Sequence, residues 1–92
     1  MKALLAIKSK DPDAKLDYQI DWAAWLAGDT IQSVAWTIPA GITSPTTSNT
    51  TTTTTIWLQG GTAGSYYEVS CKITTAAGRI EERSFGVEVQ QQ

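Results

Sequence analysis

Hydrophobic and polar residues alternate along much of this chain with the two-residue period of half-buried β-strands. The stretch KLDYQID, residues 15–21, places Leu16, Tyr18 and Ile20 on one face and charged or polar residues on the other. Other segments rich in apolar, β-branched and aromatic residues lie between glycine- and proline-containing turns. They predict further strands at residues 3–7, 30–38, 50–59, 65–75 and 80–89.

The alternation breaks directly after the first of these alternating stretches. Helical spacing, i, i+3 and i+4, is shared by three large apolar residues: Trp22, Trp25 and Leu26. Asp21 stands where an N-cap is expected and Gly28 where a helix ends. We therefore expect one short helical turn near residues 22–27, lying over one end of the sheets, with Trp25 largely buried.

The threonine-rich segment at residues 50–59 is predicted to be a strand rather than a low-complexity linker. Threonine is β-branched, and the run leads directly into Ile56, Trp57 and Leu58. Ile56 and Leu58 share one face, so Trp57 points to the other, which is solvent in a two-layered fold. The threonines are expected near a sheet edge, where their hydroxyls stay hydrated. An exposed tryptophan there is a candidate interface anchor. The candidate interface residues are Trp57, Thr53, Thr55 and, on a neighbouring outward face, Tyr66.

About seven short strands with turn signals between them predict an all-β fold, an immunoglobulin-like antiparallel β-sandwich with Greek-key connections. At 92 residues the chain is expected to form a single β-sandwich domain, residues 1–92. Trp36, expected on a central strand, and Tyr67, shortly after Gly64, fit the immunoglobulin-like pattern. Cys71 is the only cysteine, so the sandwich lacks an internal disulfide. In the alternating segment at residues 65–75 Cys71 shares the inward face with Val69 and Ile73, which predicts a buried thiol.

Charge and targeting signals exclude several classes of function. The net charge is −2 and no basic stripe occurs, which argues against a nucleic-acid partner. The apolar run at residues 3–7 is too short for a signal peptide, and no segment is long enough to span a membrane. We therefore expect the mature protein to begin at residue 1. The single cysteine, Cys71, fits synthesis in a reducing compartment.

No arrangement of residues predicts catalysis or cofactor binding. The chain has no histidine, which removes the commonest general base and metal ligand. Asp11, Asp13 and Asp17 do not make a calcium loop, because Lys15 and Leu16 occupy positions where that loop needs a ligand and a glycine. The sequence therefore predicts no enzyme, no cofactor and no metal site.

Two stretches carry a resemblance to a known family. The first is KDPDAKLDYQIDWAAWLAGDTI, and the second is IWLQGGTAGSYYEVSCKITTAAGRIEERSFGVEV, with its tryptophan strand, Gly-Gly loop, tyrosine-rich strand and Thr-Thr-x-x-Gly-Arg hairpin. In both, the chain resembles small tailed-bacteriophage proteins of the fiber-tail adaptor family. The resemblance covers nearly the whole chain except the region ITSPTTSNTT.

The resemblance implies a virion structural role in the tail region. In that role a β-sandwich joins tail or baseplate to fiber through contacts with other virion proteins, and is oligomeric in the particle. It brings no catalytic residues. The alternative is a stand-alone immunoglobulin-like module that binds a glycan or cell-surface ligand. An adaptor should carry more than one apolar patch, whereas a carbohydrate module should show a single aromatic platform.

Overall fold

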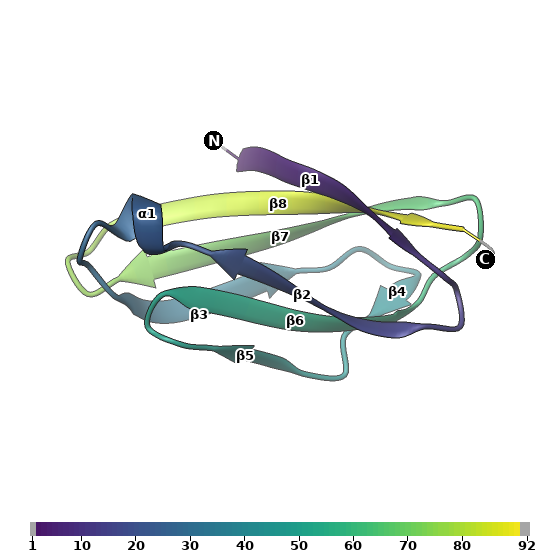
Figure 1. The fold of residues 1–92 in the computed structure, drawn as a ribbon, viewed down its shortest axis with the longest axis horizontal. Coiled ribbons are helices and arrows are strands. Elements are labelled where there is room, and N and C mark those ends of the chain that lie inside the picture. Colours follow the sequence, from purple (N-terminus) through teal and green to yellow (C-terminus); the bar gives the residue numbers. More distant parts are fainter. Residues whose placement is uncertain (1, 91–92) are drawn as a thin grey trace.

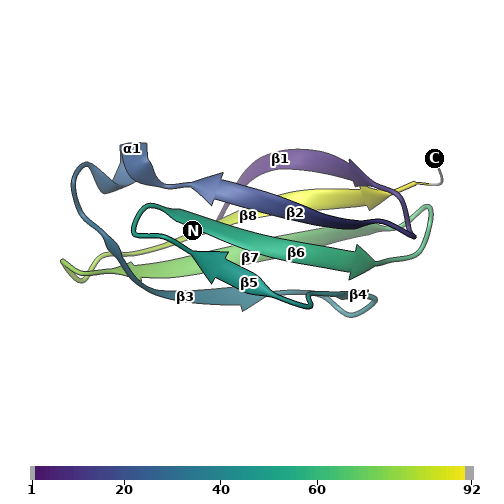
Figure 2. The same cartoon turned by 60° about the horizontal axis from the view of Figure 1, so that its bottom comes forward.

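Two β-sheets pack face to face, because each carries one apolar face that must be buried (Figures 1 and 2). The computed structural model describes residues 2–90. Sheet A has the strand order β1 (Lys2–Lys10), β8 (Ile80–Val89), β7 (Tyr66–Thr75) and β3 (Ile31–Thr37). Sheet B has the order β2 (Lys15–Asp21), β6 (Thr53–Gly60) and β4 (Ile42–Thr43), and β5 (Thr47–Asn49) also pairs with β6. The predicted all-β sandwich is confirmed.

The strand order is that of an immunoglobulin-like fold. The chain crosses from one sheet to the other after β1, β2, β3 and β6, as Greek-key connections require. One pairing departs from the expected antiparallel pattern: β1 runs parallel to β8, with Lys2 opposite Glu82 and Lys10 opposite Val89. Alternation along a strand shows which face is apolar, but it does not show which strand lies alongside. The parallel pair was therefore not predictable from the residues.

The short helical turn is present as α1 (Ala23–Leu26), which connects β2 to β3 at one end of the sandwich (Figure 1). Its ends lie one residue inside the predicted ones. Trp22 occupies the N-cap position, and the Asp21 carboxylate accepts a hydrogen bond from the Ala23 amide at 3.0 Å. The left-handed residue after the helix is Ala27 (φ 50°), followed by Gly28 with φ 98°. Two consecutive residues with positive φ reverse the chain toward β3.

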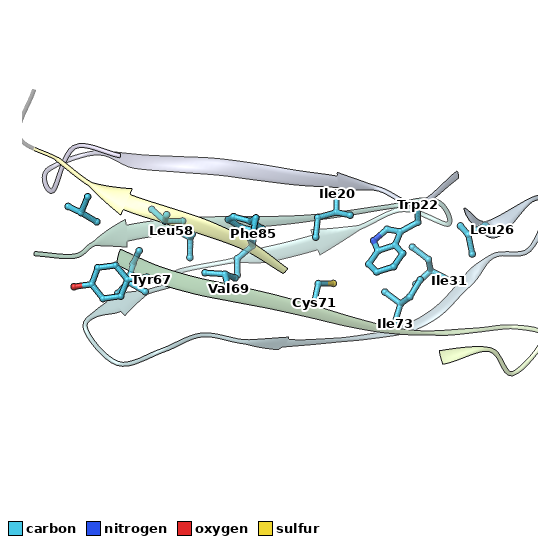
Figure 3. Packing of buried hydrophobic residues seen from close by; sticks show 14 residues of the cluster. Ile20, Trp22, Leu26, Ile31, Leu58, Tyr67, Val69, Cys71, Ile73 and Phe85 are labelled. Carbon is cyan, nitrogen blue, oxygen red and sulfur yellow. The ribbon is translucent and has the colours of Figure 1, made fainter. Parts of the chain in front are cut away.

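The buried residues form one continuous core between the sheets, contributed by almost every element (Figure 3). At one end Trp22, fully buried, lies with Leu26 and Ile31; at the other end lies Tyr67. The core residues are Ile20, Trp22, Leu26, Ile31, Ile42, Ile56, Leu58, Tyr67, Val69, Cys71, Ile73, Phe85, Val87 and Val89. The buried thiol predicted at Cys71 is confirmed, since its exposed fraction is 0%.

Two tryptophans differ from expectation. Trp25 is half-buried rather than largely buried, because it follows Trp22 by three residues on a one-turn helix whose inner side Trp22 fills. Trp36 lies on β3, which is an edge strand of sheet A and not a central one, so its indole is also only half-buried. Both residues still pack against the core.

Tyr67 forms the hydrogen bond of a tyrosine corner. Its hydroxyl accepts a hydrogen bond from the Thr62 amide at 3.0 Å, five residues upstream, and this fixes the loop between β6 and β7. At the same end the fully buried Lys10 donates from Nζ to the carbonyl oxygens of Gly60 (2.8 Å) and Asp11 (2.9 Å). These two polar contacts connect β1 and β7 of sheet A to the end of β6 in sheet B.

Candidate interaction surfaces

Three of the four candidate residues lie in one row on the outer face of sheet B. Along β6, Thr54, Ile56 and Leu58 are fully buried, while Thr53, Thr55 and Trp57 alternate with them and are half-buried. Strand β2 supplies their neighbours across the sheet: Asp21, Gln19 and Asp17, opposite Thr53, Thr55 and Trp57 respectively. We call this row with its β2 neighbours the threonine face. It presents one tryptophan among hydroxyls, an amide and two carboxylates.

The sequence suggested that the threonines lie near a sheet edge. In the structure they do not, because their strand has a partner on each side. Strand β6 pairs with β2 on one side and with β5 on the other, where Ser48 lies opposite Thr55. The preceding threonines form the β5–β6 turn: the Thr50 hydroxyl accepts hydrogen bonds from the amides of Thr52 (3.2 Å) and Thr53 (3.0 Å). Residues 47–49 lie outside every predicted strand, and their pairing with β6 removes the edge.

Tyr66 lies on the opposite side of the molecule, on the outer face of sheet A, with 49% of its surface exposed. Its ring covers Gly86 of the neighbouring strand β8, where a Cβ atom would overlap the ring. Ile7 of β1 is the register partner of Gly86 and is 55% exposed. We call Ile7, Tyr66 and Gly86 the tyrosine face. The structure therefore does not bring Tyr66 together with Trp57.

Carboxylates and a pocket border the tyrosine face. Glu88 lies opposite Tyr66 in the β7–β8 pairing, and Glu68 lies opposite Gly86. Next to them is an open pocket of about 320 Å³, lined by Gly64, Ser65, Tyr66, Glu88, Val89 and Gln90. An aromatic ring beside acidic groups suits an apolar or cationic side chain of a protein partner.

Ile7 and Gly86 were not singled out from the sequence. Ile7 stands at the end of an apolar run that predicts a strand, and nothing in the run tells which of its residues face outward. Gly86 did carry a signal, because a glycine inside a strand pattern often marks the close approach of another group. Here that group is the Tyr66 ring.

Two arginines fix the α1 end of the sandwich. The Arg79 guanidinium lies 4.3 Å from the Trp25 ring centroid, bonds the Leu26 carbonyl oxygen at 2.8 Å and pairs with Asp29 at 3.2 Å. Hydrogen bonds to the Asp29 carboxylate hold its pKa below the usual value, and the bond from the Thr75 side chain lowers the pKa most. These contacts tie α1 to the β7–β8 turn.

Arg83 extends this arrangement into the core. Its guanidinium lies over the Trp22 ring, 4.5 Å from the ring centroid. The Trp22 and Trp25 rings meet edge to face with centroids 5.9 Å apart, and the Trp22 indole donates to the Thr54 hydroxyl at 3.1 Å. Trp22 and Trp25 therefore both serve packing at this end of the sandwich.

Cys71, the one cysteine of the chain, is held as a thiol. Burial raises the pKa of the Cys71 thiol to about 11, so it is protonated and unreactive near neutral pH. Within residues 2–90 no three histidine, cysteine, aspartate or glutamate side chains gather as metal ligands would. The same part of the chain contains no helix with the length and apolar character needed to cross a bilayer.

Comparison with known proteins identifies the family. No curated protein matches the chain. The sequence profile of one family, described as podophage GP4 fiber-tail adaptor protein gp77, matches residues 10–88. The match includes β2, α1 and every strand from β3 to β7, and so contains the first stretch on which the resemblance rested and all but the last residue of the second. Since it covers well over half of the 92 residues, the chain belongs to this family of bacteriophage fiber-tail adaptors, which are structural proteins of the phage tail.

Proposed function

We propose that this protein is a non-enzymatic adaptor of the virion tail that joins tail or baseplate to fiber, and that it binds one partner on each outer face of the sandwich. The observation that carries the proposal is the placement of Trp57 and Tyr66 on opposite faces, with the core between them. An adaptor must contact two different proteins, and two separated aromatic surfaces allow both to bind without overlap. Family membership supports the role in the tail.

The two faces offer different chemistry. The threonine face is largely polar, with Trp57 as its one large apolar side chain and Asp17 opposite it. The tyrosine face is more apolar, because Ile7 and Tyr66 are both about half exposed. An aromatic residue near the centre of an interface is commonly a hot spot, whereas polar neighbours set orientation. Different partners are therefore expected on the two faces, and neither is a nucleic acid or a membrane.

The test is capture of tail and fiber proteins co-expressed with the adaptor, using Trp57→Asp and Tyr66→Asp. Each variant should lose one partner and keep the other, since a central aromatic contributes roughly 2 kcal/mol or more, about 30-fold in affinity. Gly86→Ala should weaken only the partner that Tyr66 binds, because the added methyl displaces the ring. Ala40→Asp, in the exposed loop after β3, is the matched control and should keep both partners.

Circular dichroism of each variant gives the folding control. If Trp57→Asp unfolds the protein, Trp57 belongs to the core and the threonine face is not a binding surface. If both aromatic variants fold and still capture both partners at the wild-type level, the two faces are not the interfaces. Loss of the same partner in both variants would also contradict the proposal.

A further inference from the structure

Strand β3 is a sheet edge without the charged side chains or the short length that protect the other edges of this sandwich. Among the described strands it hydrogen-bonds only with β7, and it forms one lateral margin of sheet A (Figure 2). It is seven residues long, and no charged residue or proline occurs from Ile31 to Thr37. The Ile31 amide at its start donates to the Thr51 carbonyl oxygen, and after a register shift there the strand pairs regularly with β7 from Ser33 to Thr37. A strand edge presents unpaired amides and carbonyls, so a long, neutral edge favours pairing with another strand.

The other margins are protected. Strand β1 carries the exposed Lys8, and a charged side chain on an edge strand disfavours the addition of another strand. Strand β2 exposes charged side chains at Lys15 and Asp17. Strands β4 and β5 are only two and three residues long. The contrast singles out β3.

The side chains of β3 also suit a neighbouring strand. Val34 and Trp36 lie on the inner face, opposite Ile73 and Cys71 of β7, and both remain only half-buried at the open margin. Ala35 lies between them on the outer face and is exposed. A strand added here would cover the exposed parts of Val34 and Trp36 and would satisfy the edge amides.

We propose that β3 pairs antiparallel with β3 of a second copy of this chain, about a twofold axis at Ala35. With Ala35 opposite itself, Val34 of each copy lies opposite Trp36 of the other, which pairs an aliphatic with an aromatic side chain on the buried face. A twofold contact brings each surface against itself, and a neutral strand meets no like charge in doing so. Charged edges such as those of β1 or β2 could not self-pair as readily.

This pairing goes beyond the proposed function and does not depend on it. It would join the two copies of sheet A into one continuous sheet with both tyrosine faces on the same side. A single pair of seven-residue strands is smaller than a standard protein interface, so the dimer is weak in dilute solution. It becomes populated when copies are held close together, as in an assembled tail.

The experiment measures the oligomeric state by sedimentation equilibrium from micromolar to about 1 mM, the concentration range that tethering supplies. Wild-type protein should shift from monomer to dimer. Ala35→Lys and Ala35→Glu should each stay monomeric alone, because like charges then meet at the axis. An equimolar mixture of the two variants should dimerise at least tenfold more strongly than either alone. Ala24→Lys, on the exposed side of α1, is the matched control and should dimerise like the wild type.

Three results would overturn the proposal. The first is a wild-type protein that stays monomeric over the whole range. The second is an Ala35 variant that folds by circular dichroism and dimerises as well as the wild type, which would place the contact elsewhere. The third is a mixture that does not restore the dimer. A monomeric wild type whose Ala35 variants lose capture of tail proteins would instead assign β3 to a strand from another protein. Self-association is measured with Trp57 and Tyr66 unchanged, so the two proposals can fail separately.

Discussion

Trp22 and Trp25 stand three residues apart, and the structure predicts very different costs for removing them. Trp22 is fully buried, and a tryptophan side chain buries roughly 150–250 Å². At about 25 cal/mol per Å² this corresponds to roughly 4–6 kcal/mol, an upper bound because the unfolded chain is itself partly compact. Measured tryptophan-to-alanine changes in cores cost about 3–5 kcal/mol. We therefore expect Trp22→Ala to cost about 4 kcal/mol.

A second contribution comes from the indole N–H. In Trp22→Ala the buried Thr54 hydroxyl loses its 3.1 Å donor and keeps only the Cys71 thiol at 3.5 Å. Thr54→Val, which is close in shape to threonine and removes the acceptor of this bond, leaves the indole N–H without a partner and should cost about 1–2 kcal/mol. Trp25 is half-buried and its ring faces the exposed Arg79 guanidinium. Trp25→Ala should therefore cost only about 2 kcal/mol.

Urea unfolding followed by circular dichroism measures these differences, since tryptophan fluorescence changes with each substitution. For a domain with about 5–15 kcal/mol of stability, Trp22→Ala should leave a strongly lowered midpoint with an unchanged slope. The refuting result is a Trp25→Ala cost equal to that of Trp22→Ala within the error of extrapolation. It would mean that both indoles are core residues and that α1 lies deeper than the structure has it.

Three further changes test other contacts. The free energy of unfolding should fall by up to about 3 kcal/mol as pH rises from about 9 to about 11, because the folded protein holds the Cys71 proton that the unfolded chain releases. Urea titrations over this pH range measure the effect, and Cys71→Ala should show a flatter pH profile. Arg79→Ala should lower the stability measured by thermal unfolding by about 1–2 kcal/mol. Arg79→Lys should be nearly as unstable as Arg79→Ala, because a lysine cannot bond Asp29 and the helix carbonyls at once. Tyr67→Phe should cost about 1–2 kcal/mol by leaving the Thr62 amide without its acceptor. If the variant and the wild type are equally stable in denaturant, the Tyr67 hydrogen bond does not contribute to stability.

The alternation of residues was enough to predict most of the fold. In KLDYQID the buried Ile20 and the half-buried Tyr18 lie on the predicted inner face, and the helical turn after it follows from the spacing of its apolar residues. Periodicity does not encode neighbours, however. It could not show that β1 lies parallel to β8, nor that β3 is an edge strand, because both depend on contacts between residues far apart in the chain.

The candidate surfaces were predictable in part. Parity placed Trp57 outward, and the structure agrees. The expected threonine edge was wrong because a three-residue strand, β5, pairs with β6, and such short strands carry too few residues for an alternation signal. The opposite placement of Tyr66 depends on the sheet to which β7 belongs, which only the complete topology decides. The long-range contacts of Arg79 and Arg83 with the two tryptophans leave no local pattern at all.

The parallel pairing of β1 with β8 has a mechanical consequence. Lys2 lies beside Glu82 and Lys10 beside Val89, so the two ends of the described chain leave this ladder in opposite directions (Figure 1). A force pulling on those ends slides β1 along β8, and the hydrogen bonds between them share the load and must break together. A force applied across the turn between β7 and β8 would instead open its bonds one after another. In single-molecule pulling the molecule is therefore expected to resist extension between its ends far more strongly than opening of that hairpin, a property suited to a part that carries tension.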